Sequence, residues 1–484
     1  MDVAFHDTRL AHAEKILTDE HAFLRRVVLA CAAVKTALVL IDPTMRLFLG
    51  DSATYLWSAV HLDPPPDRSF TYPLLIRLTA GVTGSLPTLL WVQTAIGVAT
   101  AALVCRILRD HFGVRRAIAA GAALLVAIEP GQLFYERMVM TETASTFALI
   151  AGVAFALAYL RTGSVRSLLA CVGFGLLLAS LRVGLVPVAL LLGIVAVVIR
   201  WRRDFGVKNL IGHLALAVGA TVLLHGGYQL LYGWGTHSAP AYIRDGGLFR
   251  LGLVAPLVKA EHFRNTGVDG ALLDDVRIPL ASARTREAQI WHPGGLVDVL
   301  RQHAGSQASA IASLVAERAI RDDPLGLLKL GLETTREYFD RDRRKERLWS
   351  DLGSGQLPDP KIEDLIRTSF HYNVSGIATM PSPVYRYFAA AELWTAACLF
   401  ALLPLAIAAA VRCRGRHGRG GLLLALLAGG FVIGQILCSH IISFRYLHPF
   451  PVLVILCGAL LVQANCAARE NKKARMGGPF GASG

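Results

Sequence analysis

Several carboxylates and arginines of this sequence stand where an apolar segment begins or ends. Asp51 follows a glycine in the largely apolar run 47–55, Glu142 opens an apolar segment, and Arg182 and Arg445 stand at the ends of two later ones. Carboxylates accept protons, and the arginine guanidinium clamps phosphate with a permanent charge. Ionisable groups at the edge of hydrocarbon are costly unless they are paired or functional. We therefore expect one pocket that holds a polar acceptor beside an anionic donor.

The two segments that carry these carboxylates contain further polar candidates. The segment 43–83 includes the proline-rich run 64–73, and the segment 129–141 lies just before Glu142. Any single side chain here is explained equally well as a solvated loop charge or an interfacial tyrosine anchor. Their gathering at the ends of five different helices favours a shared site. The additional candidates are Tyr55, Asp67, Arg68, Tyr72 and Glu136.

The composition shows which elements must position these residues. The chain has 484 residues, of which 54% are hydrophobic and only 17% are charged. Soluble proteins carry about 25% charged residues, and a helix of roughly 20 apolar residues crosses a bilayer. Several apolar runs reach that length. These features exclude a soluble enzyme and a disordered scaffold, and they predict a mainly α, polytopic membrane protein.

Apolar runs predict about ten transmembrane helices. They cover residues 25–42, 84–106, 116–133, 141–160, 166–181, 184–200, 210–231, 388–411, 420–440 and 449–466. Connectors on one side of this arrangement carry twenty cations, whereas the short loops on the other side carry six. Cytoplasmic connectors are the ones enriched in lysine and arginine. Both termini are therefore expected in the cytoplasm.

The same pattern predicts the domain organisation. We expect a cytoplasmic tail (1–24), a transmembrane core (25–231) with outer loops 43–83 and 129–141, a mixed or helical extracytoplasmic domain (232–387), C-terminal transmembrane helices (388–466) and a cytoplasmic tail (467–484). Amphipathic helices are expected at 296–320 and 325–340.

The net charge of +14 does not indicate nucleic-acid binding. The stretch 234–386 holds 19 acidic and 20 basic residues, so the excess lies in and between the apolar segments, where it sets topology. The eight cysteines also lie in apolar segments or basic connectors. We expect free thiols rather than a disulfide framework.

The order of the motifs resembles the bacterial glycosyltransferases of the GT-C superfamily. The matching residues are Gly50-Asp51 with Tyr55, Asp67-Arg68 with Tyr72-Pro73, Tyr135-Glu136 with Thr141-Glu142, and Arg445-Tyr446 with Pro449. The similarity covers about residues 25–230 and 388–466. It is closest to the dolichyl-phosphate-mannose-protein mannosyltransferase-like and aminoarabinose transferase-like enzymes. Most of these carry Asp-Glu in the first loop, whereas Ser52 follows Asp51 here.

The resemblance implies an enzyme of the bacterial inner membrane that works on the periplasmic side. It would transfer a sugar from a polyprenyl-phosphate donor to a lipid, glycan or protein acceptor. Asp51 would be the catalytic base, and Arg68, Arg182 and Arg445 would hold the lipid phosphate. The residues expected to bind acceptor or substrate are Tyr55, Asp67, Tyr72, Glu136 and Glu142.

The resemblance also bears on metal ions, because some relatives use a divalent cation. A divalent cation is therefore a possible cofactor. The histidines of the long polar segment, however, lack the short spacing of metal ligands. They are His237, His262, His292, His303 and His371.

Three other functions compete with this one. An O-antigen ligase or polymerase would use histidine and arginine from the large outer loop, such as His262 with Arg264 or His303 with Arg301. A flippase or transporter of lipid-linked sugars would carry ionisable groups in mid-membrane and helices broken at matching points of two halves. The interiors of the expected spans hold few charges, the exceptions being Lys35 and Glu392 near helix ends, and the two halves do not mirror each other. A non-catalytic assembly subunit is the third alternative.

Overall fold

The computed structural model describes residues 2–204, 206–351, 359–374, 382–413 and 417–476. Within these ranges the chain is helical, and its β-structure is limited to an isolated parallel bridge between Arg46 and Met138. The expected mainly α fold is thus confirmed for the described residues. The end of the expected cytoplasmic tail, 477–484, lies outside them.

Seven helices of the described chain are long and apolar enough to cross a membrane. They are α4 (Leu86–Arg106, extended to His111 by a π-helical turn), α7 (Glu142–Thr162), α9 (Val186–Asp204), α10 (Val207–Thr236), α19 (Glu392–Arg412), α20 (Gly418–Cys438) and α21 (Pro449–Met476). Helices α5 (Arg116–Ala127) and α6 (Pro130–Glu136) make an eighth span if the pair is counted as one, although the chain bends by 47° between them. The chain is a multi-pass membrane protein by helix length and hydropathy.

The expected count of ten spans is larger than these seven or eight. The remaining two expected spans fall in α1 (Asp2–Ile41) and α8 (Val165–Leu181). Helix α8 has 17 residues, and the apolar part of α1 carries Arg25, Arg26 and Lys35. Both helices pack along candidate spans, α1 against α4 and α8 against α7 and α9. Membrane crossing by α1 and α8 stays a prediction.

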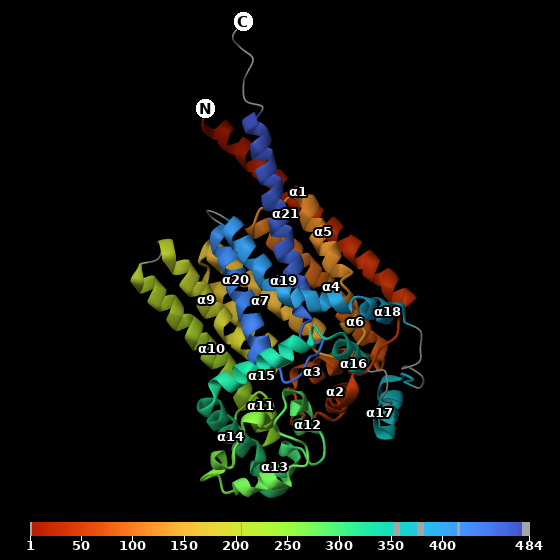
Figure 1. Cartoon of the computed structure of the whole chain (residues 1–484). Coiled ribbons are helices and arrows are strands. Elements are labelled where there is room, and N and C mark those ends of the chain that lie inside the picture. The colour runs from red at the N-terminus through yellow and green to blue at the C-terminus, as the bar shows by residue number, and fades with distance from the viewer. Residues whose placement is uncertain (1, 205, 352–358, 375–381, 414–416, 477–484) are drawn as a thin grey trace.

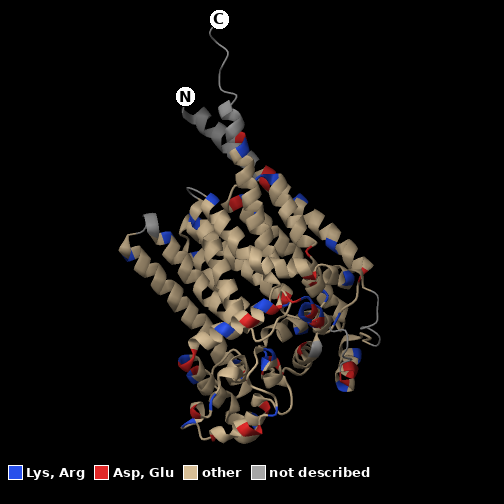
Figure 2. Ribbon diagram, in the orientation of Figure 1, with Lys and Arg blue, Asp and Glu red and all other residues tan. Residues whose placement is uncertain are grey.

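Charged side chains mark the two ends of the helical bundle, and the slab between them is almost free of charge (Figure 2). The start of α1 and the end of α21 lie at the same end (Figure 1). Ion pairs join the helices at this end. Glu20 of α1 pairs with both Arg109 and Arg116. Glu470 of α21 pairs with Arg115. The start of α1 and the end of α21 therefore lie on one side, while the compartment on that side stays a prediction.

Shorter helices gather at the opposite end of the bundle (Figure 1). They are α2 (Leu49–His61), α3 (Thr71–Ile76), α11 (Gly246–Val254), α12 (Arg286–Trp291), α13 (Leu296–Ala304), α14 (Ala308–Asp322), α15 (Pro324–Glu337), α16 (Arg341–Asp351), α17 (Pro360–Phe370) and α18 (Pro383–Ala390). The expected amphipathic stretch 296–320 is divided between α13 and α14, since Gly305 between them has a φ of 53°. Helix α15 covers the second stretch and begins with the side chain of Asp323 accepting a hydrogen bond from Gly326 N at 2.7 Å.

Two hydrophobic cores support this end. Residues between Leu248 and Ala319 form a separate core within α11–α14. By contrast, Tyr338, Leu348 and Phe388 pack into the large core of the membrane bundle. The segments that follow α14 are therefore attached to the bundle, and they can hold loops between its helices in place.

Candidate functional site

Five charged residues from separate segments meet at the end of the bundle opposite the termini, and we call them the charged cluster: Asp51, Arg68, Glu142, Arg182 and Arg445. Asp51 lies in the first turn of α2, and Glu142 lies in the first turn of α7. The positive end of a helix dipole favours a carboxylate at both positions. Arg182 is the C-cap of α8, and Arg445 lies in the turn before α21.

Arg445 lies between the two carboxylates of the charged cluster. Its Nη1 donates to Asp51 Oδ2 at 2.7 Å, and its Nε donates to Glu142 Oε1 at 3.1 Å. Arg68 pairs with the other oxygen of Asp51. Arg182 Nη1 approaches Glu142 Oε1 at 3.9 Å, which is an ion pair without a hydrogen bond. These ion pairs bring the five side chains together, while the shared pocket and the roles expected for them stay predictions.

The charged cluster is mostly shielded from water and has unused hydrogen-bonding capacity. The side chain of Glu142 is fully buried, and those of Asp51, Arg68, Arg182 and Arg445 are only 10–15% exposed. Arg182 Nη1, Glu142 Oε2 and Arg68 Nε have no hydrogen-bond partner among the described residues. Buried polar atoms normally have partners. Those three atoms can therefore accept or donate additional bonds to a polar ligand.

Backbone contacts hold the segments of the charged cluster together. Arg46 N donates to Arg137 O at 2.7 Å, and Val139 N donates to Arg46 O at 3.0 Å, which joins the two expected outer loops. Ser52 Oγ accepts from Phe48 N at 2.7 Å and donates to Val139 O at 2.9 Å. Ser52 thus fixes the start of α2. The hydroxyl of Ser69 donates to Ser180 O and links the Arg68 segment to the Arg182 segment.

Electrostatics divide the arginines of the charged cluster into two kinds. Burial alone would raise the pKa of Asp51, but Arg68 and Arg445 outweigh it and lower the pKa below 3.8. Despite burial, Asp51 raises the pKa of both Arg68 and Arg445. For Arg182, burial lowers the pKa, and Glu142 does not fully offset it. Arg182 is therefore the cation whose charge is least compensated.

Aromatic side chains surround the charged cluster. Arg445 lies over the rings of Phe48 and Tyr446, and Arg182 also lies over Tyr446 at 5.5 Å. Such contacts stabilise a partly desolvated cation. Tyr55 and Tyr72, both expected to bind substrate, are buried with ring centroids 5.0 Å apart.

Of the remaining expected residues, Asp67 joins the cluster at its edge, and the hydroxyl of Tyr72 is engaged with a neighbouring glutamine. Asp67 Oδ2 is 3.1 Å from Arg68 Nη1, and burial, with Asp51 and Asp245 nearby, raises the pKa of Asp67 although Arg68 lowers it. The hydroxyl of Tyr72 donates to Gln93 Oε1 at 2.9 Å, so it supports the fold around Tyr55.

Glu136 is not part of the charged cluster. The expectation that its carboxylate lies beside the arginines is wrong, because it pairs with Lys35 instead. Lys35 Nζ lies 2.5 Å from Glu136 Oε1, and both side chains are fully buried. Gln132 also donates to the same carboxylate oxygen at 3.0 Å. The physical reason is that 129–141 is not an open loop: it contains α6, every residue of which is buried.

Two important residues of this region were not expected from the sequence. Asp351 is fully buried and accepts hydrogen bonds from Ser443 Oγ at 2.8 Å and Phe444 N at 2.7 Å. Arg347 Nε pairs with Asp351 Oδ1 at 2.8 Å. Asp351 therefore fixes the turn that presents Arg445. Little in the sequence indicates that Asp351 is buried, because the run 341–351 has the composition of a solvent-exposed helix.

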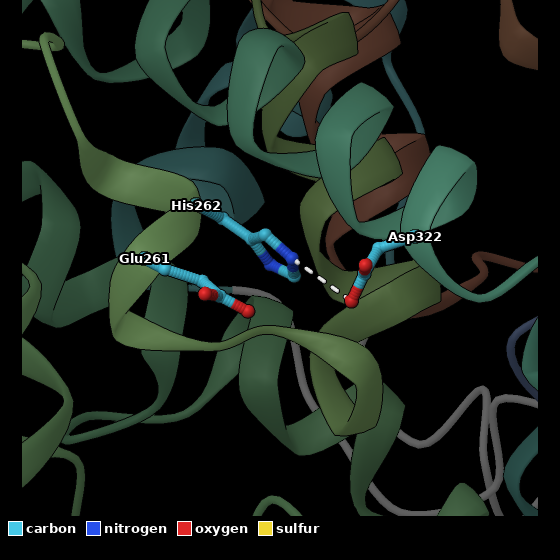
Figure 3. Close-up of side chains that lie close together, drawn as sticks. All are labelled: Glu261, His262 and Asp322. Carbon is cyan, nitrogen blue, oxygen red and sulfur yellow. Dashed lines mark ion pairs between the residues drawn. The ribbon is translucent and has the colours of Figure 1, made fainter.

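One group of side chains has the types and spacing of metal ligands: Glu261, His262 and Asp322 (Figure 3). Two observations argue against a metal there. Lys259 Nζ already pairs with Asp322 Oδ2 at 2.5 Å. His262 Nδ1 accepts from Lys259 N at 3.1 Å, so the neutral ring carries its proton on Nε2, the atom that faces Asp322. These residues fit a salt-bridged surface cluster better than a cation site.

The charged cluster does not suit a divalent cation either. Both oxygens of Asp51 are paired with arginines, and Glu142 Oε1 is paired with Arg445. A cation bound by both carboxylates would have to displace a guanidinium from Asp51, although Glu142 Oε2 has no partner among the described residues. The possible divalent cofactor therefore has no fitting site among these residues as they are arranged.

The histidine–arginine pairs considered for an O-antigen ligase have other partners. His303 Nε2 lies 3.2 Å from Asp275 Oδ2, and Arg301 pairs with Asp245 at 2.9 Å. His262 is held by Lys259 and Asp322, as described above. These contacts fix the surface of the segment that contains α11–α14.

No protein-family model matches this chain, and no curated protein matches it either. The resemblance to the GT-C superfamily consequently stands on the motifs and their order alone. What the site does must be argued from its own geometry.

Proposed function

We propose that this protein is a membrane glycosyltransferase that moves a sugar from a polyprenyl-phosphate donor to a hydroxyl-bearing acceptor at the charged cluster. The observation that supports it most is the position of Arg445 between Asp51 and Glu142, with Arg68 and Arg182 beside them. A buried structural ion pair needs only one partner for each charge. The three arginines face Asp51, Glu142 and, at the edge, Asp67, and the Nη1 of Arg182 keeps a hydrogen-bond donor without a partner among the described residues that an anion can use.

Arg182 is the best candidate for first contact with the phosphate of the sugar donor. Its Nη1 is buried and lacks a hydrogen-bond partner among the described residues, and its closest carboxylate oxygen is 3.9 Å away. A phosphate oxygen would supply the missing hydrogen bond and compensate the charge. Arg445 and Arg68 would then share their hydrogen bonds between the phosphate and Asp51.

The reaction requires a base but no general acid. The acceptor oxygen forms a bond to the anomeric carbon while the bond from that carbon to the phosphate oxygen breaks, and its electron pair stays on polyprenyl phosphate. The acceptor proton passes to the Asp51 carboxylate and then to water. In the free enzyme the two arginines hold the pKa of Asp51 low, which makes it a weak base. Diverting them to the phosphate strengthens the base when the sugar donor is bound.

The proposal includes the finer features that the resemblance implies. The fold would be GT-C-like, with α1 and α8 also crossing the membrane, and the charged cluster would face the periplasm of a bacterial inner membrane. The acceptor would be a lipid, glycan or protein of the cell envelope, positioned by Glu142, Tyr55 and Asp67.

Reconstituted protein tests this proposal whichever sugar the donor carries. Release of polyprenyl phosphate, the product common to all such donors, is measured over a panel of polyprenyl-phosphate hexoses and pentoses with cell-envelope extract as acceptor. We expect release with at least one donor and a loss of about 10²–10⁴-fold in Asp51→Asn. Asp63→Asn, in the same segment but exposed, is the matched control and should keep the wild-type rate. Equal rates in both variants would contradict the role of Asp51.

One observation favours a second candidate, a flippase or transporter of lipid-linked sugars. Lys35 and Glu136 form a completely buried pair, and ionisable pairs inside a membrane protein often mark a transport path. A transporter would move a labelled lipid-linked sugar between leaflets without breaking its phosphate bond. The same reconstitution distinguishes the two, since release of polyprenyl phosphate accompanies transfer only.

A further inference from the structure

Helix α15 has an exposed apolar stripe at the end of the membrane bundle. Leu325, Leu328 and Leu332 are spaced by three and four residues, so they share one face of the helix. All three are exposed, Leu325 by 75%. Just beyond the helix, exposed Phe339 packs on Phe400 of the candidate span α19, with ring centroids 3.9 Å apart. The stripe is thus continuous with the lateral surface of the bundle.

The opposite face of α15 is fastened to the end of α20. A Cβ atom at Gly331 would lie 1.9 Å from Ile436 O, so only glycine permits this approach. The buried Arg286 donates to Leu330 O and to Ser439 O, both at 3.2 Å, and Ser439 follows α20 directly. Helix α15 lies across the end of the bundle (Figure 1). It therefore sits at the level where a candidate membrane span ends.

The charges of α15 are ordered relative to the stripe. Lys329 follows Leu325 by four residues and Arg336 follows Leu332 by four, so both exposed cations border the stripe on the same side. Glu333 and Glu337 lie farther around the helix from the leucine stripe than the two cations. Along the ribbon of α15, basic and acidic residues alternate (Figure 2). An apolar face bordered by cations, with the acids farthest from it, matches the order of acyl chains, phosphates and water at a bilayer surface.

We propose that α15 is an interfacial helix that lies in the plane of the membrane. Leu325, Leu328 and Leu332 are immersed among the acyl chains of the adjacent leaflet, and Lys329 and Arg336 contact lipid phosphates. The partner is the lipid surface itself.

This placement has a consequence for the charged cluster. On the buried side of α15, the hydroxyl of Tyr338 donates to Ser443 O and accepts from Ser443 N, both at 3.0 Å. Ser443 precedes Arg445 by two residues. A helix anchored in the leaflet therefore holds the turn of Arg445 at a fixed depth, close to where lipid phosphates lie.

Site-specific quenching tests the proposal. An environment-sensitive fluorophore is attached to Leu328→Cys in full-length protein with Cys438→Ser, since Cys438 is an exposed thiol of the chain. The protein is placed in nanodiscs that contain nitroxide-labelled phospholipid, or exposed to iodide in water. Arg321→Cys, on the neighbouring helix α14 and 77% exposed, carries the same label as the control.

We expect lipid nitroxide to quench the probe at 328 about threefold or more strongly than the probe at 321, and iodide to show the reverse order, since interfacial helices bury their apolar face by roughly 5–10 Å. A probe at Leu325→Cys should repeat the result. Iodide quenching at 328 equal to that at 321 would overturn the proposal. Shielding of 328 from both quenchers would also overturn it, because another protein surface would then cover the stripe.

Discussion

Arg445 and Asp51 are 394 residues apart in the chain, yet Arg445 Nη1 donates to Asp51 Oδ2 at 2.7 Å. The same guanidinium uses Nε for Glu142. The last loop of the bundle is thereby tied to the first turn of α2 and of α7. A planar guanidinium can serve both carboxylates at once, whereas the ammonium of lysine is a single point charge.

Arg445→Lys should accordingly retain the positive charge and lose the bridge. We expect kcat for polyprenyl-phosphate release to fall by about 10²–10³-fold, the usual cost of removing a donor that stabilises developing negative charge. Arg386→Lys in α18 replaces an exposed arginine and serves as the control. A kcat within a factor of about two of wild type, small on the scale of 1.36 kcal/mol per tenfold in rate, would show that the bridge is dispensable.

Asp351 is predicted to be a positioning residue. Asp351→Asn should loosen the turn 443–445, so the backbone amide of Phe444 should exchange with solvent at least about tenfold faster, because local opening sets exchange rates. The KM for the sugar donor should rise more than kcat falls. Ser443→Ala removes one of the two bonds from this turn and should give a smaller effect in the same direction. Unchanged exchange at Phe444 in Asp351→Asn would contradict the assignment.

The pH dependence of the rate should report the two arginines beside Asp51. A base must be deprotonated, so the rate falls as the pH drops through its pKa, and a lowered pKa moves that limb to lower pH. For kcat/KM of the sugar donor, which reports free enzyme, the acid limb should lie at lower pH than for an ordinary aspartate. For kcat, which reports the complex, the limb should lie at higher pH, because the phosphate diverts the arginines. Coincident limbs would argue against this coupling.

The buried pair of Lys35 and Glu136 should act as a structural unit. Glu136→Gln leaves a buried ammonium without its carboxylate, and removing one partner of such a pair costs about 3–5 kcal/mol. Combining it with Lys35→Met should recover most of that loss in a denaturation experiment in detergent, with polyprenyl-phosphate release restored. If Glu136→Gln and the double variant with Lys35→Met are both as stable as wild type but no longer move lipid-linked sugar between leaflets, the result would favour the transporter.

Hydrophobic runs were sufficient to predict the helical membrane architecture. Each predicted span coincides with a helix or a helix pair, because about 20 consecutive apolar residues have few alternatives to a membrane helix. The bend between α5 and α6 was not predicted, although Pro130 stands at the break. Local sequence showed a possible helix end there, but burial of the whole of α6 depends on how distant helices pack around it.

The site was predictable in part for a similar reason. Carboxylates and arginines at the same ends of apolar segments are expected at one membrane surface, so topology predicted the shared level of Asp51, Glu142, Arg182 and Arg445, and helix packing determines that they meet. The partner of Glu136 could not be predicted, since Lys35 lies in another helix and side-chain pairing depends on helix rotation. Asp351 was missed because burial of a charged helix is a tertiary effect.

Binding of polyprenyl phosphate tests the central claim most directly, because this lipid is the product of every donor of the class. Its affinity is measured for wild type and Arg182→Ala in nanodiscs, with polyprenol, which lacks the phosphate, as the ligand control and the exposed Arg321→Ala as the protein control. We predict that wild type and Arg321→Ala bind the phosphate and not the alcohol, and that Arg182→Ala binds about tenfold or more weakly, as expected for loss of a charge-assisted hydrogen bond. Equal binding of phosphate and alcohol, or an unchanged affinity in Arg182→Ala, would contradict the account.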